Sequence, residues 1–463
     1  MPERLHSGVP GLDDVLGGGL PANAINLLVG LPGTGKTLLA HKYVFENAED
    51  DRSAVYLSTV SEPFEKIIRY GQTLSFFDVD AVGHRVFYEA LGKALLDGGL
   101  DAVLERMEQV VTRRDPRLLV LDSFKPFAEL AGSRSEYRRF LHELAARSSI
   151  RPMTSLWLGE YGLNDLATAP EFAIADAVIW LSTGRYDERE IRMLQVLKLR
   201  GSSFRSGRHA YRLSAAGMIV FPRLADPAEQ EGYKLVSRRR SSGVDELDPV
   251  VGQGYRIGSS TLVVGPSGTG KTVLGLHFTF EQAGDASRTL FATFDENPSQ
   301  IIDTASRFGW SFAESGVQLM YRSPVDLLLD EWVHELLSLV ERHHIDRVFI
   351  DGLGALRLAS HDPVRFREYL YSLVQRFARG GVTLMMSIES PELFGPARLS
   401  EVPLSQMADN ILLLQFVRRD GDYRRAVTVL KTRGARTEPR LNEYTIGAHG
   451  IELPPTRAPG SRR

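Results

Sequence analysis

The chain has 463 residues, a net charge of −3, 43% hydrophobic residues and no cysteine. These values are typical of a globular protein with two or three domains, and they exclude disulfide bonds, thiolate catalysis and cysteine-type zinc sites. The small net charge gives no overall attraction to nucleic acid or to a membrane. No apolar run approaches the ~18 residues of a membrane-spanning helix, and the N-terminus lacks the apolar segment of a signal peptide. We therefore expect a cytoplasmic protein without a membrane partner.

The first elements of the chain belong to a segment that occurs twice. "SGVPGLDDVLGGGLPANAINLLVGLPGTGKT" starts at Ser7, and "SGVDELDPVVGQGYRIGSSTLVVGPSGTGKT" starts at Ser242, in register and without a gap. A repeat of this length predicts two tandem domains rather than a solenoid. The polar stretch 223–240, which separates the copies, predicts the boundary. We place domain 1 at residues 1–225 and domain 2 at residues 236–463.

Within each copy, apolar strands alternate with helices. In domain 1, residues 24–30, 54–59 and 118–123 are short runs rich in Val, Ile and Leu, whereas residues 36–48 have the periodicity of a helix. Nearly continuous apolar strands are typical of a parallel sheet that is buried on both faces. The alternation predicts an α/β fold in each domain, with a mainly parallel sheet flanked by helices.

Two phosphate-binding loops follow from the motif GxxxxGK[ST]. "GLPGTGKT" and "GPSGTGKT" each come after an apolar strand and open a helix, which is the context that the motif requires. The glycines allow backbone N–H groups to surround an anion, and the helix N-terminus adds positive potential. We expect the lysine to reach the β- and γ-phosphates of ATP and the threonine to bind Mg²⁺. The predicted ATP-binding residues are Gly33, Thr34, Gly35, Lys36, Thr37 and Leu38 in domain 1, and Gly268, Thr269, Gly270, Lys271, Thr272 and Val273 in domain 2.

A strand that closes on an acid follows each of these loops. "LLVLD" ends at Asp122 and "RVFID" ends at Asp351. This is the Walker-B pattern, in which the carboxylate holds the Mg²⁺ shell. The predicted metal-binding residues are therefore Thr37, Asp122, Thr272 and Asp351, and the predicted cofactors are ATP and Mg²⁺. Each domain is then expected to be a P-loop ATPase domain.

The two copies differ where a RecA-type ATPase has the Glu that polarises the attacking group. "FATFDENP" carries Asp295 and Glu296, whereas "YLSTVSEP" has Val60 and Ser61 at the same places. Glu62 is displaced by one position, and in an extended segment this turns the side chain to the other face. We expect domain 2 to hydrolyse ATP and domain 1 to bind it with weak hydrolysis. A loop irregularity that brings Glu62 into reach is the alternative.

The duplicated P-loop segment, the two Walker-B strands and the paired "LKxRG" segments resemble the KaiC family, which comprises the cyanobacterial circadian clock ATPases and related KaiC-like proteins. The resemblance covers nearly the whole chain. It implies hexameric double rings of RecA-like domains with ATP at the subunit interfaces. It also implies that the "LKxRG" cations reach the neighbour's γ-phosphate, where they stabilise charge during phosphoryl transfer. In this chain these cations are Lys198 and Arg200 in domain 1, and Lys431 and Arg433 in domain 2.

The resemblance also implies a phosphorylation site. In KaiC, the second domain phosphorylates itself on a Ser-Thr pair shortly before an Asp and an apolar strand. "PLSQMADNILLLQFV" places Ser405 at the Ser position and Gln406 at the Thr position, whereas domain 1 has Phe172 there. We therefore expect serine autokinase activity in domain 2 at Ser405, without a two-site cycle. The alternative is that Ser405 caps a helix or strand and that water accepts the phosphoryl group.

Two other classes of protein share parts of the pattern. A RecA-type recombinase or helicase would have the same fold and ring, but it predicts pore loops rich in cations and aromatic residues. "RRRSSG" lies at the domain junction and "VRRDGDYRR" is typical of a hairpin loop, so we do not expect a nucleic-acid partner. In a scaffold without kinase activity, ATP would only assemble the ring, and Val60 and Ser61 keep this option open for domain 1.

The end of the sequence differs from the KaiC pattern. KaiC carries a longer tail that its activator grasps, whereas only "PPTRAPGSRR" follows "YTIGAHGIEL" in this chain. We therefore expect a homohexameric KaiC-like ATPase with protein partners in bacterial signalling or stress response, rather than a clock protein with the usual partners.

Overall fold

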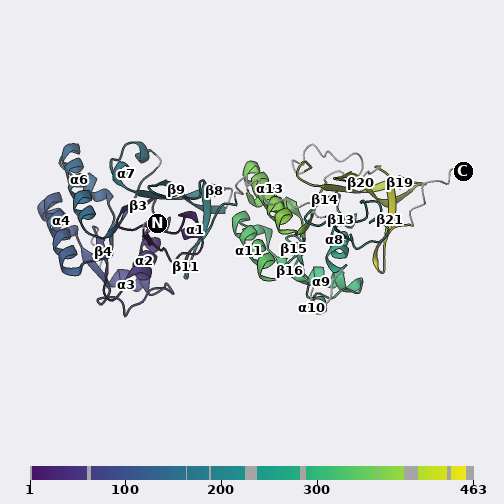
Figure 1. Ribbon diagram of the computed structural model, residues 1–463, viewed down its shortest axis with the longest axis horizontal. Coiled ribbons are helices and arrows are strands. Elements are labelled where there is room, and N and C mark those ends of the chain that lie inside the picture. Colours follow the sequence, from purple (N-terminus) through teal and green to yellow (C-terminus); the bar gives the residue numbers. More distant parts are fainter. Residues whose placement is uncertain are drawn as a thin grey trace. The chain divides into compact units, whose positions relative to one another are not determined.

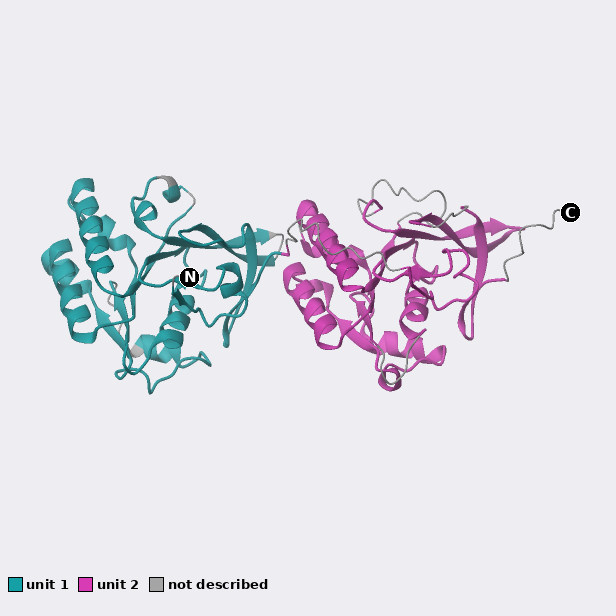
Figure 2. Ribbon diagram, in the orientation of Figure 1, with its two compact units in different colours: residues 1–223 teal, residues 224–463 magenta. Residues whose placement is uncertain are grey.

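The computed structural model describes residues 3–59, 64–162, 164–186, 189–224, 237–281, 288–360, 362–390, 405–434 and 439–454. The chain divides into two compact units, Met1–Arg223 and Leu224–Arg463, which are coloured separately in Figure 2. Several sequence predictions lie outside the described residues, namely those on Val60, Ser61 and Glu62, on most of the boundary segment, and on the tail after residue 454.

Unit 1 is built on one sheet, whose described strands have the order β11-β10-β9-β8-β3-β7-β6-β4-β5. The strands from β8 to β5 in this order are all parallel, and β9, β10 and β11 extend the sheet in an antiparallel way. A short pair, β1 (Arg4–Leu5) and β2 (Leu20–Pro21), lies outside the sheet. The sheet strands are β3 (Ile25–Gly30), β4 (Ala54–Ser58), β5 (Val86–Ala90), β6 (Leu118–Asp122), β7 (Thr154–Gly159), β8 (Ala177–Tyr186), β9 (Arg189–Leu199), β10 (Arg208–Ser214) and β11 (Gly217–Phe221).

Helices cover both faces of the sheet in unit 1, as Figure 1 shows. One apolar core joins the sheet to α1 and α2, and a second core joins the opposite face to α4, α5 and α6. This arrangement explains why the central strands are apolar throughout. The helices are α1 (Leu12–Val15), α2 (Lys36–Asn47), α3 (Phe64–Gly71), α4 (Gly92–Arg114), α5 (Lys125–Leu130), α6 (Arg134–Ile150), the 3₁₀ turn η1 (Asp165–Ala167) and α7 (Glu171–Ile174).

Unit 2 repeats this architecture, with the described strands in the order β16-β15-β17-β18-β14-β19-β20-β21-β22. The strands from β16 to β19 are parallel, and β20, β21 and β22 are antiparallel additions. The strands are the short pair β12 (Arg239–Arg240) and β13 (Tyr255–Arg256), and the sheet strands β14 (Ser260–Gly265), β15 (Thr289–Thr293), β16 (Gln318–Tyr321), β17 (Arg347–Asp351), β18 (Thr383–Glu389), β19 (Asn410–Arg419), β20 (Asp422–Thr432), β21 (Leu441–Gly447) and β22 (Gly450–Glu452).

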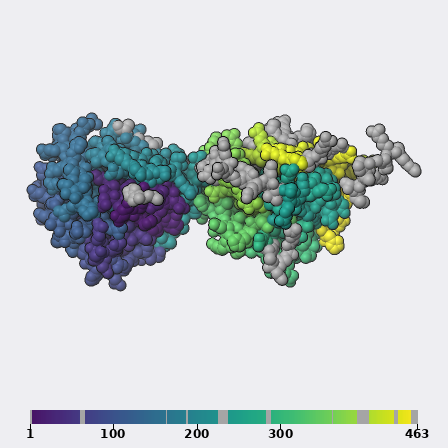
Figure 3. All heavy atoms as spheres, viewed as in Figure 1, coloured from purple at the N-terminus to yellow at the C-terminus, as the bar shows by residue number. Residues whose placement is uncertain are grey.

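The helices of unit 2 also form two layers. One core includes α8 and α9, and the other includes α11, α12 and α13. The side chains of these cores fill the interior of each unit, and Figure 3 shows one face of the surface that encloses them. The helices are α8 (Lys271–Phe280), α9 (Pro298–Arg307), α10 (Phe312–Ser315), the 3₁₀ turn η2 (Pro324–Asp326), α11 (Leu329–Arg342), α12 (Leu353–Ser360) and α13 (Pro363–Gly380).

The predicted fold class is confirmed, since both units have a mainly parallel sheet flanked by helices. The predicted strands at residues 24–30, 54–59 and 118–123 are β3, β4 and β6, and the predicted helix is α2. Among the described residues, no helix has both the length and the apolar character needed to cross a membrane. In a parallel sheet the carboxyl ends of the strands meet at one edge, which is where such folds bind ligands. Both phosphate loops and both Walker-B acids lie at this edge of their sheets.

Candidate nucleotide sites

Each phosphate loop turns between a buried strand and a helix. In unit 1 the loop joins β3 to α2, and Gly33 and Gly35 have φ angles of 79° and 90°. In unit 2 the loop joins β14 to α8, and Gly268 and Gly270 have φ angles of 79° and 91°. Side chains with a Cβ rarely adopt this left-handed conformation, which explains the glycines of the motif. The two loops therefore share one backbone shape, with free N–H groups at a helix N-terminus.

The loop lysines fold back over their own loops. Lys36 Nζ donates to the carbonyls of Gly30 (2.8 Å) and Leu31 (3.0 Å), and Lys271 Nζ donates to the carbonyl of Pro266 (3.0 Å). Burial lowers the pKa of both lysines, and nearby carboxylates oppose this shift. Each loop thus holds a cation beside the N-terminus of a helix, which is an arrangement suited to phosphate.

The predicted metal-binding residues are brought together in both units. Thr37 Oγ1 donates to Asp122 Oδ2 over 3.1 Å, and Thr272 Oγ1 donates to Asp351 Oδ2 over 2.7 Å. Oxygen donors of this kind suit Mg²⁺, which also keeps waters and binds substrate phosphates. Within the described ranges, no group of three or more His, Asp or Glu side chains could hold a metal alone. The residues therefore fit an Mg²⁺ ion that arrives with the phosphates of ATP.

Glu296 joins this cluster in unit 2. Its carboxylate accepts from Thr272 Oγ1 over 3.5 Å, and the side chain is half-buried. Asn297 directly after it caps α9 through a reciprocal pair of hydrogen bonds with Gln300, each of 3.1 Å, so the chain turns at a defined point. Burial raises the pKa of Glu296, and the charge of Asp351 raises it further. A carboxylate with a raised pKa is a stronger base.

Asp295 is the more exposed of the two predicted acids. Its Oδ2 atom lies beside Gly352, where an added methyl group would come within 3.0 Å. Burial raises the pKa of Asp295, and the charge of Glu389 contributes. The hydrogen bond to the metal-binding threonine singles out Glu296, rather than Asp295, as the candidate base.

Two further acids were not predicted from the sequence. Glu389 ends β18, and Glu160 directly follows β7. Their charges act to raise the pKa of the loop lysines, Glu389 on Lys271 and Glu160 on Lys36, against the larger effect of burial. The signal for these acids was available, because "LGEY" and "SIES" have Glu at the same place in the two copies.

A tyrosine braces each phosphate loop from the antiparallel part of the sheet. The Tyr211 hydroxyl of β10 donates to the carbonyl of Thr34 over 2.7 Å, and the Tyr444 hydroxyl of β21 donates to the carbonyl of Thr269. These tyrosines were also not predicted, although "HAYRLS" and "NEYTIG" place them at equivalent positions. These hydrogen bonds connect the antiparallel strands, β9 to β11 in unit 1 and β20 to β22 in unit 2, to the phosphate loop of the same unit.

The "LKxRG" cations of unit 1 contact α7, the short helix before β8, and the aspartate that follows it. Lys198 Nζ donates to the carbonyls of Phe172 (3.2 Å) and Ala173 (2.9 Å). Arg200 pairs with Asp176 over 3.4 Å. Burial lowers the pKa of Lys198, and the charge of Arg200 adds to this.

The same contacts recur in unit 2, at the predicted phosphorylation site. Lys431 Nζ donates to the carbonyls of Ser405 (3.1 Å) and Ala408 (2.6 Å), and Arg433 pairs with Asp409 over 3.2 Å. Burial lowers the pKa of Lys431 as well, with the charge of Arg433 acting in the same direction. Ser405 itself is half-buried in the turn. The predicted cations and the predicted acceptor therefore belong to one hydrogen-bonded group.

The turn that carries Ser405 is anchored to the central strand of its sheet. Asp409 Oδ2 accepts from the backbone N–H (3.0 Å) and the hydroxyl (3.2 Å) of Ser260, at the start of β14. In unit 1, Asp176 accepts from the N–H of Ile25 in the same way, over 3.1 Å. The turn thus has a fixed position relative to the strand that leads into the phosphate loop.

Comparison with known proteins decides the family. The sequence model of the KaiC family of ATPases matches residues 5–225 and 240–458. The chain belongs to this family. The resemblance seen in the sequence is thereby confirmed, and the two sheets correspond to tandem RecA-like domains of a P-loop ATPase that binds ATP.

Curated KaiC proteins align with almost the whole chain. The circadian clock protein KaiC3 of Synechocystis sp. is 28% identical over 97% of this chain and 92% of its own length. The circadian clock oscillator proteins KaiC of Picosynechococcus sp. and Synechococcus elongatus are 27% and 26% identical, each over 97% of this chain and 89% of their own length. These alignments extend through both units of the chain.

Proposed function

We propose that this KaiC-family ATPase is a cytoplasmic ring protein in which domain 2 (residues 236–463) performs most of the hydrolysis and domain 1 (residues 1–225) mainly binds nucleotide. The observation that carries the proposal is the cluster of Thr272, Asp351 and Glu296 at the second phosphate loop, with hydrogen bonds of 2.7 and 3.5 Å. A metal-binding hydroxyl, a Walker-B carboxylate and a candidate base are thereby assembled at one site. Domain 1 has Val60 and Ser61 in place of the acids.

The residues of unit 2 have separable roles in phosphoryl transfer. Lys271 supplies positive charge at the phosphate loop, and Thr272 and Asp351 would hold Mg²⁺, which neutralises charge on the phosphates when bound. Glu296 accepts the proton of the attacking hydroxyl or water, because its raised pKa brings its proton affinity closer to the operating pH. Tyr444 supports the shape of the loop, since its hydroxyl bonds to the loop backbone.

A comparison of the two loop lysines tests the division of labour. We expect Lys271→Ala to remove most of the steady-state ATP turnover of the full chain and Lys36→Ala to leave most of it. The measurement is phosphate release at saturating ATP and Mg²⁺. Single-stranded DNA should not stimulate either rate, whereas a RecA-type recombinase or helicase would respond. Loss of most turnover in the Lys36→Ala chain, with its assembly intact, contradicts the proposal.

We also propose that the ring is a homohexamer that forms with ATP. Support comes from Lys198, Arg200, Lys431 and Arg433, which the family resemblance places on the neighbour's γ-phosphate. We expect light scattering to give a hexamer at micromolar chain with saturating ATP and Mg²⁺, and Arg433→Ala with Arg200→Ala to weaken it. A monomer of the unaltered chain under these conditions rejects the ring.

We further propose that domain 2 is a serine autokinase that phosphorylates Ser405, within a signalling or clock-type regulator that acts on protein partners. Support comes from the hydrogen bond between Lys431 and the Ser405 carbonyl, because Lys431 is one of the cations assigned to phosphoryl transfer. The competing function is an ATP-gated scaffold without kinase activity. Labelling with ATP, described in the Discussion, separates the two.

A further inference from the structure

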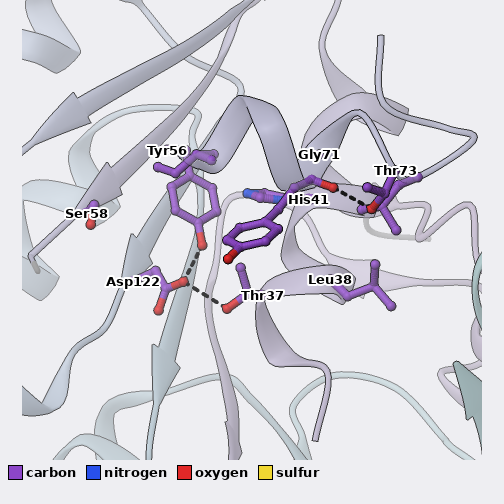
Figure 4. Close-up of a pocket in the computed structure, with 11 residues that line it drawn as sticks. Thr37, Leu38, His41, Tyr56, Ser58, Gly71, Thr73 and Asp122 are labelled. Carbon is purple, nitrogen blue, oxygen red and sulfur yellow. Dashed lines mark hydrogen bonds between the residues drawn. The ribbon is translucent and has the colours of Figure 1, made fainter. Parts of the chain in front are cut away.

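The two Walker-B acids receive different hydrogen bonds. Strand register places Ser58 beside Asp122 in unit 1 and Thr293 beside Asp351 in unit 2. Tyr56 lies two positions before Ser58 in β4, and Phe291 lies two positions before Thr293 in β15, so the two residues are equivalent. The Tyr56 hydroxyl donates to Asp122 Oδ2, and Figure 4 shows that Thr37 bonds to the same carboxylate oxygen. Phe291 has no hydroxyl with which to do this.

In unit 2 a different residue supplies the second hydroxyl. Ser387 Oγ donates to Asp351 Oδ1 over 2.5 Å, whereas Thr272 bonds to Oδ2. Strand register puts Leu158 at the place of Ser387 in unit 1. The second donor thus bonds to the same carboxylate oxygen as the metal-binding threonine in unit 1, and to the other carboxylate oxygen in unit 2.

Tyr56 is held in this position by two aromatic neighbours whose places in unit 2 are taken by leucine. Its side chain is buried, and its ring lies 4.9 Å from that of His41 and 5.4 Å from that of Tyr88, between centroids. In unit 2, Leu276 takes the place of His41, because each lies five positions after its loop lysine. Leu319 takes the place of Tyr88, because it pairs with Phe291 in the sheet. The phenol therefore cannot swing aside without disturbing its neighbours.

The number of lone pairs on each carboxylate oxygen limits how many hydrogen bonds the Walker-B acid can still accept from metal-bound water. Each carboxylate oxygen has about two acceptor positions. Thr37 and Tyr56 use both positions on Asp122 Oδ2, so a metal-bound water finds none there. On Asp351 Oδ2, Thr272 uses one position, and among the described residues the second hydroxyl goes to Oδ1.

We propose that Tyr56 is a positioning residue that occupies the Asp122 oxygen beside the metal-binding threonine, so that domain 1 binds nucleotide with less dependence on Mg²⁺ than domain 2 does. The inference rests on the proposed function in one respect, namely that domain 1 binds ATP. The inference adds a second difference between the two ATP sites. They differ in how strongly nucleotide binding depends on Mg²⁺, as well as in whether they carry the acidic pair Asp295 and Glu296. Domain 1 would then stay loaded when Mg²⁺ falls, whereas domain 2 would empty.

The test uses the full chain with Lys271→Ala, which leaves domain 1 as the nucleotide site. The affinity for a fluorescent ATP analogue is measured with Mg²⁺ and with excess chelator, and no turnover is needed. With Tyr56 present, we expect removal of Mg²⁺ to change the dissociation constant less than about threefold. In the Tyr56→Phe variant, removal of Mg²⁺ should raise the dissociation constant about tenfold or more. A change of this size corresponds to the free energy of one hydrogen bond to a charged group.

The reciprocal exchange is the matched control. In a Lys36→Ala chain, where domain 2 is the site, Phe291→Tyr should reduce the dependence on Mg²⁺. Thermal melting shows whether this variant folds, and if it does not, the Tyr56→Phe comparison decides alone. Equal dependence on Mg²⁺ with Tyr56 and with Phe at that position overturns the inference only. A Lys271→Ala chain that binds no analogue with or without Mg²⁺ overturns the proposed ATP binding of domain 1 and the inference with it.

Discussion

Replacing Glu296 with Gln is expected to slow ATP turnover by about 10²- to 10⁴-fold, the range that a positioned general base contributes. Glutamine keeps the size of the side chain and can still accept a hydrogen bond from Thr272, but it cannot take a proton. The measurement is phosphate release by the full chain at saturating ATP and Mg²⁺. Affinity for an ATP analogue should change little, which separates loss of chemistry from loss of binding.

Asp295→Asn is the matched control for this substitution. Asp295 is adjacent in the chain and also acidic, but it is more exposed and does not bond to the metal-binding threonine. Its replacement should therefore cost much less turnover. Because burial raises the pKa of Glu296, turnover should also fall on acidification at a higher pH than for an ordinary glutamate base. If Asp295→Asn costs as much as Glu296→Gln, or if Glu296→Gln costs less than about threefold, the base is not Glu296.

Ser405→Ala is expected to abolish covalent labelling of the chain by ATP that carries a labelled γ-phosphate. An acceptor must come within about 3–3.5 Å of the phosphorus, in line with the leaving oxygen. Ser405 lies in a turn fixed to β14 through Asp409 and held by Lys431, so its position relative to the sheet is defined. Peptide mapping of the labelled chain should place the phosphate on the peptide that contains Ser405.

Two further variants make the labelling experiment decisive. Ser306→Ala removes an exposed hydroxyl of α9 and should leave the label unchanged, whereas Glu296→Gln should remove it together with ATP turnover. Label that survives Ser405→Ala rejects Ser405 as the acceptor. An unlabelled wild-type chain, whose turnover is still abolished by Glu296→Gln, would be a plain ATPase in which water is the acceptor.

The parallel core of the fold could be predicted because its signals are local. Runs of Val, Ile and Leu mark β3, β4 and β6, and the gap-free repeat transfers each assignment to the second copy. The order of the strands in the sheet has no such local signal. It depends on which runs meet after the chain has crossed over, and this is decided by packing.

The same distinction applies to the candidate sites. The loop residues and the Walker-B acids were predicted, because each motif is contiguous and its chemistry requires those residue types. Tyr56, Ser387 and the bracing tyrosines were missed, since their partners come from strands that are adjacent only in the folded sheet. The comparison of the two copies contained part of this information. Position 56 differs between the copies as Tyr and Phe, at a place where a hydroxyl changes the hydrogen bonds of the metal-binding acid.

The bracing tyrosines have a consequence for how the protein is made. Tyr211 lies 177 residues after its partner Thr34, and Tyr444 lies 175 residues after Thr269. A chain that emerges from the ribosome N-terminus first therefore exposes each phosphate loop long before its brace has been synthesised. Contacts of such long range also form late in folding, because the closure of a large loop costs entropy first. Each unit thus acquires its fully braced phosphate loop only when nearly all of that unit has been translated.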